Sequence, residues 1–314
     1  MRDALVHYWL TNMRGGERVL ETFCEMFPQA DIYTHVVDRS KLSDTLNRHE
    51  IKTTFVSNLP FAKSQYQKYL PFMPRALEER DLAGYDLVIS SESGPAKGVI
   101  TSAARVDQFI ANSNFVARRI RKFYRRDSEV VFPPVAVSEF AQARQAGPGE
   151  YYLAAGEMVG YKRFDLVVDA FTKLGAPLVV VGEGAQMKSL QQRAGPNVKF
   201  VGRVKFSELK QRFGACKALV FPGEEDFGMI PVEVMAAGRP VIAYGKGGAL
   251  DTVVDGKTGI LFGEQTVDSL IDAVSRFEAV EFDADQIHAH ARGFDADQIK
   301  SKVKAILEQN GLEL

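Results

Sequence analysis

Two glutamates and a glycine-containing loop make residues 221–233, Phe-Pro-Gly-Glu-Glu-Asp-Phe-Gly-Met-Ile-Pro-Val-Glu, the stretch best suited to chemistry. A strand is expected to end where this stretch begins, and a helix to start near Pro231. The backbone N–H groups of residues 227–230 then lie at a helix N-terminus, where the helix dipole favours phosphate. Glu225 and Glu233 need another role beside an anion site, and the hydroxyls of a ribose or hexose supply one. The alternative is that Glu233 only satisfies the helix dipole.

Four further glycine-containing loops follow expected strands of the second half. They span residues 156–162, which offer Lys162 to a diphosphate, 181–184, 200–204 and 240–249. Ligands of open α/β sheets bind beyond the carboxyl ends of the strands, so these loops are expected to gather there. In the first half, Gly15 and Gly16 follow the first expected strand, and glycine lets the backbone approach a ligand closely.

Short β-branched runs alternate with helical patterns along almost the whole chain. The strands expected in the first half are residues 4–8, 31–36, 86–90 and 107–111, with helices at 17–26 and 114–123. The strands expected in the second half are 151–155, 178–181, 198–201, 218–221, 241–243 and 259–262, with helices at 164–173, 185–193, 206–213, 231–237 and 267–277. Continuous apolar strands that alternate with helices indicate a parallel sheet covered on both faces. The sequence therefore predicts two such sheets in tandem.

A length of 314 residues favours two domains. Phe132-Pro-Pro-Val135 ends one expected strand, and its two prolines make a stiff connector. We therefore expect one domain over residues 1–134 and another over 135–294. A C-terminal helix over 295–314, capped by Asp295, is a candidate to pack back on the first domain.

Composition excludes several classes of protein. The chain is 46% hydrophobic and 25% charged, which excludes a disordered, collagen-like or coiled-coil protein. A net charge of −1 gives no field that would favour nucleic acid. No apolar run is long enough for a transmembrane helix, and the N-terminus is too polar for a signal peptide. Two cysteines in different halves indicate reduced thiols, so we expect a cytoplasmic protein.

Two local patterns allow alternative interpretations. Residues 118–126 carry six basic side chains, which form either a solvated helix face or a contact with anionic lipid or a phosphorylated acceptor. Phe-Asp-Ala-Asp-Gln-Ile occurs at both 282–287 and 294–299. Two helix starts explain this repeat better than a metal site, because aspartate favours a helix cap and first turn.

The motifs together resemble glycosyltransferase family 4, the retaining nucleotide-sugar enzymes of the GT-B architecture. The likeness is strongest to bacterial mannosyltransferases of O-antigen and exopolysaccharide assembly. Glu225 to Glu233 matches the family's E-x7-E motif, while residues 5–10 and 14–18 match its opening strand and double-glycine loop. Residues 109–113 and 132–135 look like the last strand of the first domain and its exit. The resemblance spans nearly the whole chain and implies two Rossmann-like parallel-sheet domains that face each other across a cleft.

The resemblance also implies a role for each matched residue. Glu233 would bind the donor ribose, Glu225 would contact the hydroxyls of the transferred sugar, and Lys162 would neutralise the diphosphate leaving group. Arg203 and Val204 would flank the base. The implied catalytic residues are Glu225 and Lys162, and the implied donor-binding set is Gly15, Gly16, Lys162, Arg203, Val204, Glu225, Phe227, Gly228, Met229, Ile230 and Glu233. No metal or other cofactor is expected, because basic side chains and a helix dipole stabilise the departing diphosphate.

The expected function is therefore transfer of a hexose from a nucleotide sugar, with mannose from GDP-mannose as the first choice. The implied acceptor is a lipid-linked saccharide at the inner face of the membrane, where the protein would be peripheral. Two departures from the family pattern favour an alternative, a donor-binding but catalytically impaired form or a non-catalytic partner subunit. Glu157 stands where the family has an arginine, and the connection between Thr101 and Arg105 is short and lacks the family's His-Thr-Pro segment. A nucleotide-sugar epimerase of the same architecture is a more distant alternative.

Overall fold

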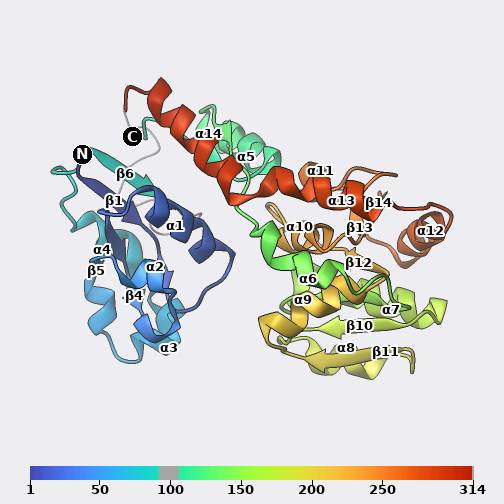
Figure 1. Ribbon diagram of the computed structural model, residues 1–314. Helices are drawn as coiled ribbons and strands as arrows, with labels where there is room; N and C mark the ends of the chain where they lie inside the picture. Colours follow the sequence, from blue (N-terminus) through green and yellow to red (C-terminus); the bar gives the residue numbers. More distant parts are fainter. Residues whose placement is uncertain (92–105, 313–314) are drawn as a thin grey trace. The chain divides into compact units, whose positions relative to one another are not determined.

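The computed structural model describes residues 1–91 and 106–312 (Figure 1). The chain divides into two compact units, Met1–Phe109 and Ile110–Leu314. The short connection predicted between Thr101 and Arg105 falls outside the described residues.

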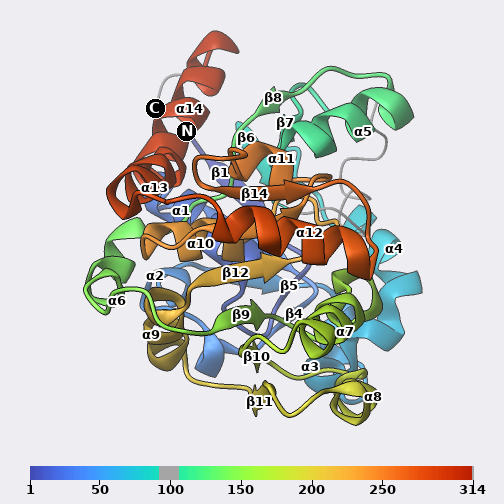
Figure 2. The ribbon, with the colours of Figure 1, turned by 90° about the vertical axis from the view of Figure 1, so that its right-hand side faces the viewer.

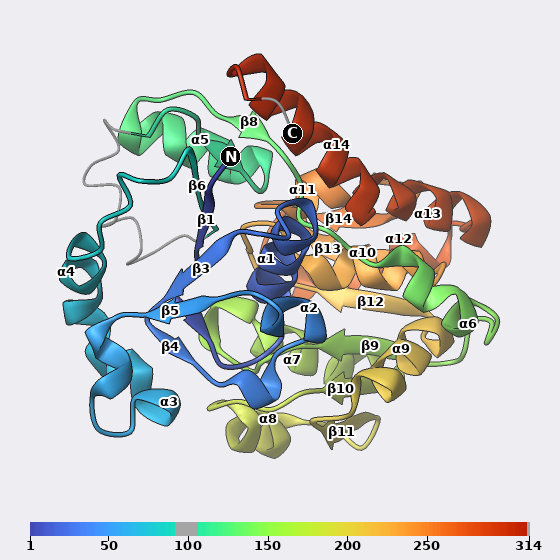
Figure 3. The ribbon, with the colours of Figure 1, turned by 60° about the vertical axis from the view of Figure 1, so that its left-hand side comes forward.

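The first unit is built on a four-stranded parallel sheet with the order β5-β3-β1-β6. Its strands are β1 Asp3–Val6, β3 Asp31–Thr34, β5 Ile51–Thr53 and β6 Leu87–Ser90, and Figure 3 shows β1, β3 and β5 following one another. A two-residue ladder joins β2 (Trp9–Leu10) to β4 (Val36–Val37). The α-helices are α1 Gly15–Met26, α2 Asp44–Asn47, α3 Ala62–Gln65 and α4 Met73–Glu78. Ala4, Val6 and Tyr33 pack with Leu77 of α4 in a buried cluster.

The second unit contains a six-stranded parallel sheet with the order β11-β10-β9-β12-β13-β14. Its strands are β9 Tyr152–Ala155, β10 Leu178–Val181, β11 Val198–Gly202, β12 Ala218–Phe221, β13 Val241–Tyr244 and β14 Gly259–Phe262. Figure 2 shows β12, β9, β10 and β11 following one another in this order. The strand order reverses between β9 and β12, the position where doubly wound sheets bind their ligands.

Helices cover both faces of this sheet. Buried residues of α7 (Phe164–Leu174), α8 (Met187–Arg193) and α12 (Val267–Glu278) form one core with alternate strand residues such as Ala154. Buried residues of α9 (Phe206–Ala215), α10 (Met229–Ala236) and α13 (Ala284–Ala291) form the other with Leu153 and its counterparts. Alternate side chains of one strand thus enter opposite cores, which explains why these strands read as continuous apolar runs.

Residues 110–134 belong to the second unit by their contacts. They form β7 (Ile110–Ala111), α5 (Asn114–Tyr124) and β8 (Glu129–Val130), and β7 pairs with β8 in a separate two-stranded sheet. The strand predicted at 107–111 is therefore shorter and does not join the described first sheet. The predicted domain boundary after residue 134 lies within the second unit as its contacts define it. The assignment of residues 110–134 to the first domain therefore stays a prediction.

The second unit also contains two short helices and a longer one at its end. They are α6 Ala141–Arg144, α11 Ala249–Thr252 and α14 Ala296–Gln309. Asp283 and Asp295 cap α13 and α14, which confirms that the repeated hexapeptide marks two helix starts. Packing of α14 on the first domain stays a prediction. None of the helices in residues 1–91 and 106–312 has the length and apolar content needed to span a bilayer.

Replacing Asp283 by alanine should lower the free energy of unfolding by about 1 kcal/mol, because its carboxylate caps α13. The side chain accepts hydrogen bonds from the N–H groups of Asp285 (2.8 Å) and Gln286 (3.2 Å). Urea-induced unfolding of the full chain measures the change. Asp283→Asn keeps a capping oxygen and is the control. An equal loss in both variants would contradict the capping role.

Candidate functional site

The loops that follow the central strands of the second sheet are joined by backbone hydrogen bonds at its carboxyl edge. The N–H of Gly156, after β9, donates to Val181 O of β10 at 3.0 Å. The N–H of Gly248, after β13, donates to the carbonyl of Glu225, after β12, at 2.8 Å. The loops predicted to gather at this edge therefore do so, and their main chains support one another.

Two glycines allow these loops to lie against one another, because any side chain at either position would collide with the main chain of the neighbouring loop. A Cβ at Gly182, where φ is +129°, would lie 1.8 Å from the carbonyl oxygen of Gly156. A Cβ at Gly248 would lie 2.2 Å from Phe227 Cα. The loop pairs β9–β10 and β12–β13 can come together only with glycine at these positions.

Lys162 and Glu225 form an ion pair at the point where the strand order reverses. Lys162 ends the short 3-10 helix Gly160–Lys162 after β9, and Glu225 lies in the loop between β12 and α10. Lys162 Nζ and Glu225 Oε1 are 3.0 Å apart, and the two side chains are 17% and 20% exposed. Apart from this ion pair, Glu225 Oε1 is buried and accepts no hydrogen bond within the described residues. The two residues predicted to be catalytic, Lys162 and Glu225, thus lie together, and the carboxylate can accept a hydrogen bond from a hydroxyl.

Helix α10 begins beside this pair and provides amide groups. It starts at Met229, two residues before the predicted Pro231, and Gly228 precedes it with φ +83°. The first turn contains no acidic residue, so the positive end of the helix dipole is not neutralised from within the helix. Phe227 is buried and stacks on Phe132 with ring centroids 5.6 Å apart, which anchors the loop that leads into the helix.

The remaining predicted residues are distributed around the same edge, with one exception. Glu233 is half-buried in the middle of α10, while Arg203 (exposed) and Val204 (half-buried) follow β11. Gly15 and Gly16 instead begin α1 in the first unit. Their role toward a donor bound in the second unit stays a prediction.

Sequence reasoning missed the attachment of α5 to the candidate site. Arg119 Nη1 donates to Asp226 Oδ1, in the loop beside Glu225, at 2.8 Å. Asn114 at the start of α5 donates from its backbone N and its side-chain Nδ2 to Asp251, both at 2.8 Å. These partners lie more than a hundred residues apart in the sequence, and no local pattern indicates their contact.

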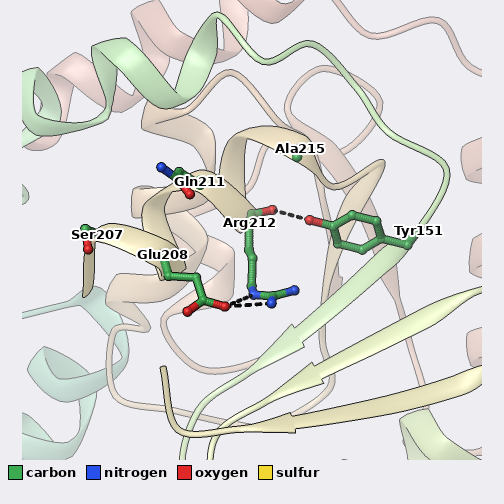
Figure 4. A pocket seen from close by; sticks show the side chains of 6 residues that line it. All are labelled: Tyr151, Ser207, Glu208, Gln211, Arg212 and Ala215. Atoms are coloured by element: carbon green, nitrogen blue, oxygen red, sulfur yellow. Dashed lines mark hydrogen bonds and ion pairs between the residues drawn. The ribbon is translucent and has the colours of Figure 1, made fainter. Parts of the chain in front are cut away.

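A separate open hollow of about 520 Å³ lies along α9 (Figure 4). Its lining residues are Tyr151, Ser207, Glu208, Gln211, Arg212 and Ala215. Arg212 already pairs with Glu208 at 2.7 Å, and Tyr151 Oη donates to the backbone carbonyl of Arg212 at 3.1 Å. None of the predicted site residues lines this hollow, so it is not the site built around Lys162.

Comparison with known proteins agrees with this geometry. The family model of glycosyl transferases group 1 matches residues 138–294, half of the chain. The GDP-mannose-dependent alpha-(1-6)-phosphatidylinositol monomannoside mannosyltransferase of Mycobacterium tuberculosis is 30% identical over 45% of this chain and 42% of its own length. The O-antigen chain mannosyltransferase RfbU of Salmonella typhimurium is 29% identical over 56% of this chain and 55% of its own length. The chain thus spans about half the length of each of these relatives.

Solved structures share the fold over nearly the full chain. The lipopolysaccharide outer core galactosyltransferase WaaB in its apo form has a TM-score of 0.75 at 18% identity, and covers 98% of this chain and 100% of its own. Anabaena Alr3699/HepE in complex with UDP-glucose has a TM-score of 0.73 at 18% identity, with the same coverage. The predicted α/β class with two parallel sheets is confirmed, and its structural neighbours have the GT-B fold. The chain belongs to the glycosyl transferases group 1.

Proposed function

We propose that this protein transfers a hexose from a nucleotide sugar, with retention, to a lipid-linked saccharide of surface polysaccharide assembly. The observation that carries the proposal is the Lys162–Glu225 pair beside the start of α10, at the reversal point of the second sheet. A cation, a carboxylate and a helix N-terminus meet there. A sugar linked to a diphosphate needs these three groups.

Each group has a distinct part in the proposed reaction. The ammonium of Lys162 and the amides at the start of α10 stabilise the negative charge that develops on the departing diphosphate. Glu225 accepts hydrogen bonds from hydroxyls of the transferred sugar, and Glu233 binds the ribose. Before the donor binds, Glu225 compensates the partly buried charge of Lys162, so the site needs no other counter-ion.

GDP-mannose is the first candidate for the donor because one relative is named as GDP-mannose-dependent and a second is named a mannosyltransferase. The name of the Mycobacterium relative includes GDP-mannose, and RfbU is named an O-antigen chain mannosyltransferase. The fold neighbour HepE was solved with UDP-glucose, so the base must be tested rather than assumed. Calorimetric binding of GDP, UDP and ADP to the full chain decides between them.

A donor-binding form with impaired transfer is the second candidate. Glu157 is exposed after β9, at the position where the resemblance implies an arginine. An acid near a diphosphate is unfavourable unless it faces away from it. Transfer assays with a panel of nucleotide sugars separate this alternative from an active enzyme, whereas binding assays alone do not.

Replacing Lys162 by methionine should lower the transfer rate by roughly a hundredfold to a thousandfold, the usual effect of losing one group that stabilises developing charge. Nucleotide diphosphate affinity should fall as well. Lys173→Met is the matched control, because Lys173 makes a surface ion pair with Asp268 on α12. Steady-state transfer and calorimetry measure both effects. Equal behaviour of the two variants would contradict the role of Lys162.

Replacing Glu233 by alanine should weaken nucleotide diphosphate binding by about 1–3 kcal/mol, because the ribose hydroxyls lose their acceptor. The same loss should appear when the unchanged protein binds a 2′,3′-dideoxynucleotide diphosphate. Combining the variant with the dideoxy ligand should add little further loss. Additive losses in this calorimetric cycle would show that Glu233 does not bind the ribose.

We further propose that the protein binds an anionic inner-membrane surface. Residues 59–75 contain no acid, and Lys63 and Lys68 lie among exposed aromatic side chains, with Phe61 74% and Phe72 54% exposed. Exposed apolar side chains that alternate with basic residues suit the interface of an anionic bilayer. Helix α5 adds an exposed basic face of its own with Phe123.

Vesicles that contain anionic lipid should therefore bind the protein, and binding should fall as salt increases. A Phe61→Ser, Phe72→Ser double variant should bind more weakly because it loses apolar surface that enters the interface. Leu250→Ser changes an apolar residue outside this segment that is 51% exposed, close to the value for Phe72, and is the control. Co-sedimentation that does not distinguish neutral from anionic vesicles would rule out this proposal.

A further inference from the structure

Three consecutive acids lie in the loop that leads to the proposed diphosphate site. Residues 224–226 are Glu-Glu-Asp, and helix α10 starts three residues later at Met229. Negative charges this close to a helix start oppose a diphosphate that binds there, unless cations offset them. The acidic loop and the proposed ligand are therefore compatible only if other parts of the structure compensate these carboxylates.

Two of the three acids have basic neighbours from loops at the same edge of the sheet. Glu225 pairs with Lys162, which follows β9. Glu224 acts on Lys246, which follows β13: a hydrogen bond with the Tyr244 side chain raises the pKa of Lys246, and the charge of Glu224 adds to this effect. The loops that follow β9 and β13 thus each supply a cation to the acidic loop.

Asp226 takes its cation from helix α5 instead. Arg119 Nη1 donates a hydrogen bond to Asp226 Oδ1 at 2.8 Å, and the two side chains are 53% and 43% exposed. A pair as exposed as this contributes little to stability. Its effect is on the charge of the loop, because Arg119 offsets the Asp226 carboxylate next to Glu225 and leaves Lys162 to pair with Glu225.

Helix α5 presents Arg119 from a fixed position. The buried Ser113 caps the helix, and Asn114 donates two hydrogen bonds, both of 2.8 Å, to the carboxylate of Asp251 in α11. The guanidinium carbon of Arg119 lies 5.8 Å from the ring centroid of Phe115, a cation–π contact that restrains the side chain. Arg119 is thus anchored toward the loop that carries Glu225 rather than left as a solvated charge.

We propose that Arg119 is a positioning residue of the donor site, which acts through Asp226 to make the acidic loop 224–226 compatible with a nucleotide diphosphate. The inference deepens the proposed function and rests on it. Without Arg119, the Asp226 carboxylate is uncompensated beside the start of α10 and repels the ligand. Because Arg119 acts through this carboxylate, removing the charge of Asp226 should make Arg119 dispensable.

Variants of the full chain separate this role from a general loss of positive charge. Arg119→Met removes the cation, Asp226→Asn removes the charge that it compensates, and the double variant removes both. Arg119→Lys keeps a cation that can pair with Asp226. Arg193→Met is the matched control, because Arg193 is 50% exposed and donates from Nε to Asp169 of α7 at 3.0 Å. Arg193 ends α8, where the chain returns to the start of β11.

Calorimetry with GDP, UDP and ADP measures the affinity of each variant. For a nucleotide that binds the unchanged protein, Arg119→Met should lower affinity roughly threefold to tenfold, the size expected for one uncompensated charge that acts through solvent on a multiply charged ligand. The loss should shrink as salt increases, because salt screens exposed charges. Arg119→Lys should keep most of the affinity, and the double variant should bind within about twofold of the unchanged protein. Arg193→Met should match the unchanged protein.

The outcomes distinguish this inference from the proposed function on which it rests. If the unchanged protein binds none of the three nucleotides, the proposed donor site is wrong and the inference falls with it. If it binds one of them and Arg119→Met binds that nucleotide equally well, only the inference is overturned. A loss that persists in the double variant also overturns it, because Arg119 then does not act through Asp226. An equal loss in Arg193→Met would show a general effect of charge and overturn it as well.

Discussion

The close approach of main chains at the carboxyl edge of the second sheet is the constraint on which the candidate site depends. Gly182 against Gly156 and Gly248 against Phe227 leave no room for a side chain. These contacts fix the loops after β9 and β12, and those loops carry Lys162 and Glu225. The two charged groups can meet at 3.0 Å only because the main chains beneath them are held. The chemistry of the site therefore depends on residues that have no side chain.

The ion pair has two opposing effects on a ligand. Neither partner is fully buried, so the pair itself contributes little to stability, on the order of 1 kcal/mol or less. Its value lies in holding an ammonium and a carboxylate in one place before the donor arrives, which reduces the cost of ordering them during the reaction. The same pairing means that a diphosphate must share Lys162 with Glu225. A donor that offers hydroxyls to Glu225 as it binds Lys162 resolves this competition, whereas inorganic phosphate does not.

The sequence predicted the second unit better than the first for a physical reason. Five strands of the second sheet are largely buried and appear as apolar runs, from Tyr152–Ala155 to Gly259–Phe262, and only the edge strand β11 has an exposed residue, Lys199. In the first unit, β5 (Ile51–Thr53) is a short, half-buried edge strand without such a signal, and it was missed. Lys162 and Glu225 could be predicted because both follow strands whose neighbours are set by topology. The contact between Arg119 and Asp226 could not, because only tertiary packing brings α5 to that loop.

The starts of two helices, one in each unit, differ in charge although a glycine lies at both. Helix α10 has no acid in its first turn and lies beside Lys162, so its amides face a place where negative charge is favoured. Helix α1 instead has the buried Glu17 in its first turn, and Gly16 lies beside His7, whose pKa is lowered to about 4 by burial, so no cation offsets that acid from His7 at pH 7. A glycine precedes or begins each helix, and the glycines alone would suggest the same ligand at both. The proposed diphosphate site therefore rests on the charges around the start of α10, which are Lys162 and the lack of an acid in the first turn, rather than on its glycine.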